Sequence, residues 1–283
     1  MSQSSIPIIN QTPSDAVTGK TQRNIDKENS RKNTLFVVLT GIFLTNALLA
    51  EIIGTKIFSL ESALGVPAAG IKLWADHALN FDLTCGVVLW PVVFITTDII
   101  NEYYGKSGVR RISLLTVFFI SYVFMMIWVI TELPPADFWV DLHKPTNINE
   151  AFNSIFLQSL GIIIGSITAF LIGQALDVIA FQWLRKFTGS KNIWLRATGS
   201  TLFSQLIDSF VVLGIAFYLF GEPRWELSQL LSVGVVNYIY KFSVAICLTP
   251  VLYGAHYLID HYLGKENAER MIEEASQSSF VSS

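Results

Sequence analysis

The sequence is poor in charged residues. Asp, Glu, Lys and Arg make up 14% of the 283 residues, and 52% are hydrophobic, whereas soluble domains carry about 25% charged residues. A net charge of −3, with no clustered basic face, excludes nucleic acid as an expected partner. The apolar residues form long blocks without the period of an amphipathic helix or strand, and they lack the short alternating segments of a membrane barrel. We therefore predict an all-α membrane protein that spans the lipid bilayer.

Cysteine and histidine are scarce too. Cys85 and Cys247 lie in apolar runs, so we interpret them as small buried residues, with a disulfide or metal site as the alternative. The closest histidines, His256 and His261, do not share a helix face. The sequence contains no Gly-x-x-x-x-Gly-Lys-Ser/Thr, His-Glu-x-x-His or Gly-x-Ser-x-Gly motif. We thus expect neither an enzyme nor a bound metal or cofactor.

Six apolar segments are each long enough to cross a bilayer, which needs about 20 helical residues. They form an expected transmembrane domain over residues 33–262, between a disordered polar tail at 1–32 and a second polar tail at 263–283. Pro91 is expected to kink the second span or mark a substrate site. Asn147 and Glu150 form a capping pair at the start of the fourth. The predicted spans are 34–58, 83–103, 112–131, 152–183, 194–220 and 229–259.

Lysine and arginine are distributed unequally between the two sides of this topology. Most lie in the two tails and in the second and fourth loops, while the other side holds only Lys72, Lys144 and Arg224. The positive side of a membrane protein faces the cytoplasm, so both termini are predicted to be cytoplasmic. The first external loop, residues 59–82, is either an interfacial hairpin or a partly re-entrant segment.

Polar side chains occur inside the predicted spans, where a charge costs at least about 2.5–3.5 kcal/mol. Their spacing of three or four residues places several of them on common helix faces. Lys241 is expected to pair with Asp208 or another acid. We expect the substrate-binding residues to be Glu51, Asp98, Asn101, Glu102, Gln174, Asp177, Gln205, Asp208, Asn237 and Lys241.

An interior of acids and amides flanked by aromatic rings fits a flat polar heterocycle. A carboxylate accepts two parallel N–H bonds from a guanine-like edge, an amide or lysine donates to the ring carbonyl, and an aromatic face stacks on the ring. Cations and amino acids satisfy the same groups and remain alternatives on this ground.

The string Thr97-Asp-Ile-Ile-Asn-Glu-Tyr-Tyr-Gly105, preceded by Trp90-Pro91, resembles the signature of the bacterial queuosine precursor transporter family, also called the vitamin uptake transporter family. Residues 54–58 and 204–209 support the resemblance. It implies a six-span inner-membrane importer of a 7-deazaguanine such as preQ0 or preQ1, used to make queuosine in tRNA. It also implies that Asp98, Asn101 and Glu102 belong to the characteristic site, with Gln205 and Asp208 facing them.

An alternative hypothesis is a substrate-binding subunit of an ATP-driven vitamin or nucleobase uptake complex, since the chain has no phosphate-binding motif of its own. Transport driven by protons through Asp98 or Asp208 is a further hypothesis. Gly161-x-x-x-Gly165 allows close helix approach, either inside the bundle or in a homodimer.

Overall fold

The computed structural model describes residues 13–54, 56–71, 79–157, 160–188, 193–219 and 224–281, and these are mainly helical. Five helical segments are long and apolar enough to cross a membrane: Ile25–Ile53, Trp90–Thr131, Gly165–Leu184, Leu202–Leu219 and Leu227–Leu263. The predicted all-α membrane class is therefore confirmed, whereas the count of six spans and the cytoplasmic termini stay predictions. The long helices are α1 (Pro13–Ile53), α3 (Trp90–Thr131), α6 (Leu160–Thr188), α7 (Ile193–Leu213) and α8 (Leu227–Leu263).

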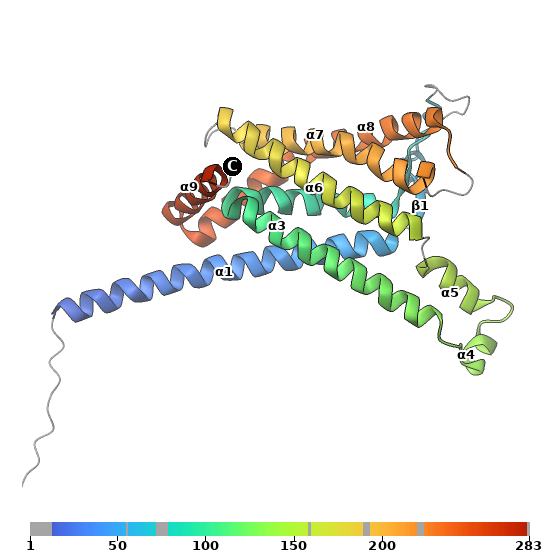
Figure 1. The fold of residues 1–283 in the computed structure, drawn as a ribbon, viewed down its shortest axis with the longest axis horizontal. Coiled ribbons are helices and arrows are strands. Elements are labelled where there is room, and N and C mark those ends of the chain that lie inside the picture. The colour runs from blue at the N-terminus through green and yellow to red at the C-terminus, as the bar shows by residue number, and fades with distance from the viewer. Residues whose placement is uncertain are drawn as a thin grey trace, which may run out of the picture.

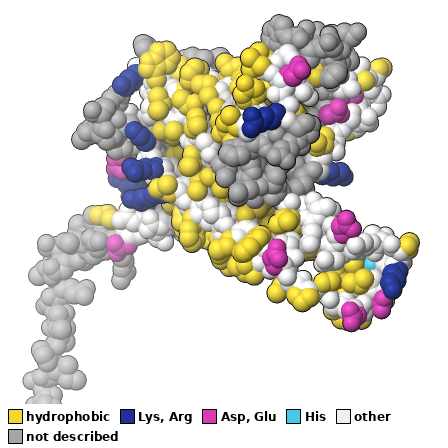
Figure 2. Space-filling view, turned by 45° about the vertical axis from the view of Figure 1, so that its right-hand side comes forward, with side chains coloured by type: hydrophobic (Ala, Val, Ile, Leu, Met, Phe, Trp, Pro, Cys, Tyr) yellow, Lys and Arg dark blue, Asp and Glu magenta, His cyan; other side chains and the backbone are white. Residues whose placement is uncertain are grey.

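Shorter elements connect or extend these helices. Strands β1 (Ile57–Ser59) and β2 (Asp82–Thr84) pair antiparallel, with Phe58 opposite Leu83. The other short elements are helix α2 (Leu60–Leu64), a 3-10 turn (Cys85–Val88), α4 (Asp137–Leu142), α5 (Ile148–Phe156), a π-helical extension of α7 (Gly214–Leu219) and α9 (Lys265–Val281). Apolar side chains cover much of the face in Figure 2, while Lys and Arg gather at one end of it.

Helix α3 consists of two helical segments that meet at Gly105, whose φ of 66° and ψ of −169° are not helical. Glycine reaches this conformation easily because it has no Cβ. In Figure 1 both segments run from the end of the molecule next to α9 toward the side that holds β1 and α4. The predicted spans 83–103 and 112–131 fall on these two segments. The segments meet directly at Gly105, whereas a loop between residues 103 and 112 was expected.

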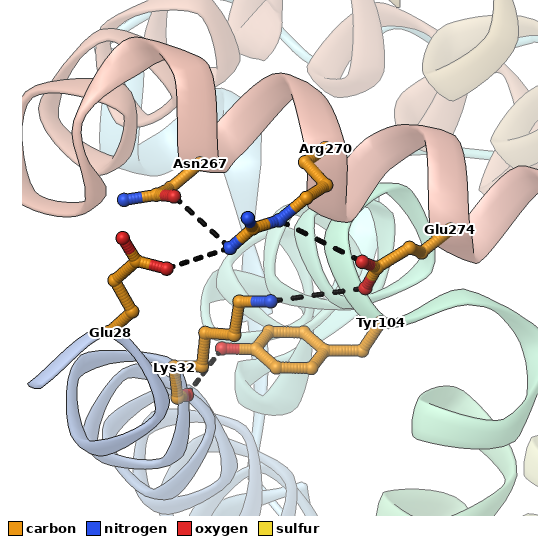
Figure 3. Close-up of polar contacts among 6 residues, drawn as sticks. All are labelled: Glu28, Lys32, Tyr104, Asn267, Arg270 and Glu274. Atoms are coloured by element: carbon orange, nitrogen blue, oxygen red, sulfur yellow. Dashed lines mark hydrogen bonds and ion pairs between the residues drawn. The ribbon is translucent and has the colours of Figure 1, made fainter. Parts of the chain in front are cut away.

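The polar tail predicted over residues 1–32 stays a prediction; from Pro13 onward the structure describes these residues as part of α1, and residues 1–12 lie outside the described part. The end of this polar stretch is held against α9 (Figure 3). Arg270 Nη2 lies 2.8 Å from Glu28 Oε2, and Lys32 Nζ lies 3.8 Å from Glu274 Oε2. The Tyr104 hydroxyl donates to the Lys32 carbonyl at 2.7 Å. These contacts hold α1 against α3 and α9 at Glu28 and Lys32.

Several predicted helix boundaries also differ from the structure. Strand β2 and the 3-10 turn occupy the start of the expected second span, so Pro91 stands in the first turn of α3 and does not kink it. Proline fits there because its missing N–H has no intrahelical acceptor at that position. The expected fourth span is divided into α5 and α6. The Asn147–Glu150 cap is confirmed, since Glu150 N–H donates to Asn147 Oδ1 at 3.3 Å, but it begins α5.

The hairpin formed by residues 57–71 and 79–84 is organised around Glu61, which is buried. Its Oε1 accepts from the Phe81 N–H at 2.8 Å and the Ala69 N–H at 3.3 Å, and its Oε2 accepts from Ser59 Oγ at 3.3 Å. The Phe81 hydrogen bond contributes most to lowering the pKa of Glu61 below its ordinary 4.5. The described residues of loop 59–82 pair as a hairpin, and its placement at the interface or partly inside the bilayer stays a prediction.

This lowered pKa predicts a pH dependence of stability. Because the folded-state pKa of Glu61 lies below 4.5, its contribution is fully present above 4.5 and is lost as the pH falls through the lowered value. Melting curves of the purified protein in detergent are expected to show Glu61→Gln destabilised relative to wild type at pH 7, with the difference shrinking in acid. Exposed Glu132 provides the control, since Glu132→Gln is expected to track wild type. A difference that does not change with pH contradicts this role.

Gly105 gives a second prediction. A Cβ at this position would lie 3.1 Å from the Ala275 carbonyl oxygen, and its backbone conformation is nearly exclusive to glycine. Gly105→Ala is therefore expected to lower the free energy of unfolding by about 1–3 kcal/mol. Gly41, which has open space around its Cα, is the matched control, and Gly41→Ala should match or exceed wild-type stability. Equal melting temperatures for the Gly105 variant and wild type would rule out the strain.

Candidate functional site

The first segment of α3 carries a buried polar face. Asp98 is 6% exposed, Glu102 is 1% exposed, and Asn101 is completely buried. Their separation by three and four residues places them on one side of the helix. Asp98 also lies close enough to Asp177 of α6 for the two carboxyls to interact electrostatically. Three carboxyl groups near one another repel when ionised, so this region favours a ligand that donates hydrogen bonds.

Side chains of α6 bridge this face to the neighbouring helices. Gln174 Nε2 donates to Thr97 Oγ1 at 3.4 Å, and Gln182 Nε2 donates to Asn101 Oδ1 at 2.9 Å. Asp177 Oδ1 accepts from Ser204 Oγ of α7 at 3.3 Å. Polar contacts thus connect α3, α6 and α7 through the interior of the bundle.

A pocket of about 50 Å³ lies between α3 and α8. Asp98 and Lys241 supply its charged groups. Trp90 and Phe94 line it as well, with ring centroids 5.9 Å apart and an interplanar angle of 22°, and so does Tyr240. The pocket therefore combines an acceptor, a donor and flat aromatic surfaces.

Some buried polar atoms on α3, α6 and α7 have no hydrogen-bond partner among the described residues, and one of them, on Asp98, lines the pocket. A buried donor or acceptor left in this way costs about 1–3 kcal/mol, and such groups are uncommon in folded proteins. They are available to a ligand or to water. The atoms concerned are Asp98 Oδ1, Asn101 Nδ2, Gln174 Oε1 and Gln205 Oε1.

The expected site residues divide into separate groups. Asp98, Asn101, Glu102, Gln174, Asp177 and Gln205 are all buried on α3, α6 and α7. Lys241 shares the pocket with Asp98. Glu51 is held elsewhere, because Ser166 Oγ donates to its Oε1 at 2.6 Å; neither it nor Asn237 is among the pocket-lining residues. The Asp208 side chain lies outside the described part, so its pairing with Lys241 stays a prediction.

Sequence reasoning missed the partners that hold the signature in place. The Tyr103 hydroxyl donates to Asp260 Oδ1 at 2.7 Å and lies 3.0 Å from His256 Nδ1. Since the single hydroxyl proton goes to Asp260, His256 Nδ1 is the donor of the second bond. Tyr103 and His256 also stack, with centroids 5.3 Å apart. These contacts join α3 to α8, as Gln182 joins it to α6, and no local spacing in the sequence indicates them.

Comparison with known proteins places this site in a family context. A family model described as "Putative vitamin uptake transporter" matches residues 84–255, which include the α3 polar face and the pocket. The chain is 29% identical over 185 residues to the "Probable queuosine precursor transporter" of Haemophilus influenzae, covering 64% of this chain and 72% of that protein. It is 30% identical over 184 residues to the "Probable queuosine precursor transporter" of Bacillus subtilis, covering 62% and 72%.

The "Queuosine precursor transporter" of Escherichia coli is 28% identical over 179 residues, covering 62% of this chain and 73% of that protein. No solved structure matches the chain. The family model covers more than half of the sequence, and the matched region contains the Asp98–Gly105 signature. The expected resemblance is thereby confirmed, and the chain belongs to the family described as "Putative vitamin uptake transporter".

Proposed function

We propose that this protein is a transporter that imports a queuosine precursor, a 7-deazaguanine such as preQ0 or preQ1, across the bacterial inner membrane for use in tRNA. The names of three relatives support this substrate. The observation that carries the proposal is the pocket between α3 and α8, where a carboxylate, an ammonium group and aromatic rings lie together. The relatives are named as transporters, which favours this function over a binding subunit of an ATP-driven complex.

The recognition chemistry follows from the pocket lining. Asp98 Oδ1, which has no partner among the described residues, accepts an N–H from the base. Lys241 donates to the ring carbonyl, and the faces of Trp90 and Phe94 lie along the ring. A carboxylate acceptor away from water makes a strong hydrogen bond because charge-assisted bonds are about twice as strong as neutral ones.

We place the chain in the membrane with six crossings: α1, the two segments of α3, α6, α7 with its π-helical extension, and α8. An even number puts both termini on one side, which the positive-inside rule assigns to the cytoplasm. The gathering of Lys and Arg at one end in Figure 2 supports this orientation. The contacts of α9 with α1 support it too, because they bring the C-terminal helix next to Glu28 and Lys32, on the N-terminal side of the first span.

The test is rescue of a strain that cannot synthesise the precursor. Expression of this protein is expected to restore queuosine in tRNA at limiting external 7-deazaguanine. Asp98→Asn, which removes the charged acceptor, is expected to reduce initial uptake about tenfold or more. Uptake and membrane abundance are measured together. Val92→Ala is the control, since Val92 lies on α3 with its side chain 39% exposed and does not line the pocket.

Uptake by Asp98→Asn at the wild-type rate would remove Asp98 from the binding site. A wild-type protein that restores no queuosine would contradict the proposed function itself. Purified protein in liposomes adds a second readout, because uptake in the absence of ATP separates an autonomous carrier from a subunit of an ATP-driven complex.

A further inference from the structure

The side chain of Gln182 binds one of the two polar atoms of the Asn101 amide and leaves the other unpaired among the described residues. Gln182 Nε2 donates to Asn101 Oδ1 at 2.9 Å, from a half-buried position on α6. An amide carries its oxygen and its NH₂ group in different directions. With Oδ1 committed to Gln182, the buried Nδ2 remains, and it has no hydrogen-bond partner among the described residues. Asn101 can therefore donate a hydrogen bond from Nδ2, the amide atom that Gln182 does not bind.

Asp98 supplies the complementary group one helical turn earlier. Its Oδ1 is a buried acceptor without a partner in the described ranges, and it lines the pocket. The face of α3 therefore presents an acceptor followed by a donor. A ring with a lactam edge, an N–H beside a C=O, matches this order. A ring with a 6-amino group presents the opposite order, an acceptor nitrogen beside an N–H donor.

We propose that Gln182 is a positioning residue that makes Asn101 a hydrogen-bond donor to the lactam carbonyl, and so sets a preference for 6-oxo over 6-amino bases. This inference rests on the proposed function. A carbonyl oxygen has two lone pairs, so it accepts from both Asn101 and Lys241.

Access to Asn101 requires the walls of the pocket to move. The pocket measures about 50 Å³, whereas ligand pockets usually measure about 300–1,000 Å³. A bicyclic base can enter only if α3 and α8 separate. Asn101 lies one helical turn beyond Asp98 on α3 and does not line the pocket, so the base would meet it only when the pocket enlarges along α3.

Two substitutions at Gln182 separate donor from acceptor character. Gln182→Lys keeps a donor toward Asn101 Oδ1, and the half-buried position near the end of α6 lets its ammonium reach water. Gln182→Glu offers an acceptor, which attracts Asn101 Nδ2 and turns Oδ1 inward. The lysine variant is expected to retain the wild-type preference, and the glutamate variant to lose it.

The experiment measures uptake of 7-deazaguanine and of 2,6-diamino-7-deazapurine into liposomes containing the purified full chain. The initial rate for 7-deazaguanine divided by that for 2,6-diamino-7-deazapurine is expected to fall about tenfold in Gln182→Glu. A change of this size corresponds to one mismatched hydrogen bond at a buried site. The ratio should stay near wild type in Gln182→Lys and in the control Ile179→Ala, whose side chain is 60% exposed on α6. Melting temperatures of all variants show whether the bundle is intact.

A second variant tests the same idea from α3. Asn101→Asp still accepts the Gln182 Nε2–H but presents a second oxygen inward, so its ratio should fall as in Gln182→Glu. Equal losses of both bases, or an unchanged ratio, in Gln182→Glu would show that Gln182 is only structural and would overturn the inference while leaving the transport function standing. A wild-type protein that carries neither base would overturn both.

Discussion

The hydrocarbon core of a membrane offers no hydrogen-bond partners, and this constraint shapes the interior of the protein. Backbone groups are satisfied within helices, and polar side chains must find partners inside the bundle. Most polar groups of the described spans obey this rule. Thr97, Ser113 and Thr116 donate back to carbonyls one turn earlier. Tyr103 is bonded to α8, and Glu51 to Ser166 of α6. Helix packing in this protein therefore depends on polar contacts as well as on apolar ones.

The turn at Gly105 connects this polar interior to the ion-paired end of the molecule. A Cβ at Gly105 would crowd the Ala275 backbone at 3.1 Å, and the positive φ of this residue favours glycine as well. The close approach of the two residues brings α9 against α3, and Arg270 and Lys32 extend the contact to α1 (Figure 3). The ion pairs are partly exposed, so each is worth little by itself. The buried faces of Ala268, Met271 and Ala275 hold α9 in place, and the charges determine its orientation.

The sequence was sufficient to predict the membrane class, the family and most of the buried acids and amides, because lipid penalises such groups strongly enough to make each one informative. Its predictions differ from the structure where a tertiary contact is involved in local structure. The polar stretch before Asn33 has no apolar signal, yet from Pro13 onward it belongs to α1, and Glu28 and Lys32 contact α9. Pro91 lies inside a long apolar run of the sequence, which predicts a break in a helix. The composition does not show the strand pairing at Leu83 that shortens the helical part of this run. Gln182 and Asp260 bind signature residues that are 81 and 157 positions away in the sequence, whereas spacing rules reach only one or two helical turns.

The pairing of polar groups separates structural positions from the candidate site. Glu61, Glu51 and Asp260 each have identified donors, so their burial needs no ligand to explain it. Asp98 Oδ1 and Asn101 Nδ2 lie one turn apart with no partner in the described chain, although both are within reach of helices rich in hydroxyl and amide groups. A purely structural interior would have satisfied them at small cost, because a serine or threonine on α6, α7 or α8 can bond either atom. Asp98 Oδ1 stays unpaired in a pocket with a lysine and aromatic walls, one turn from the unpaired Asn101 Nδ2, and this supports a solute that completes their hydrogen bonds during passage.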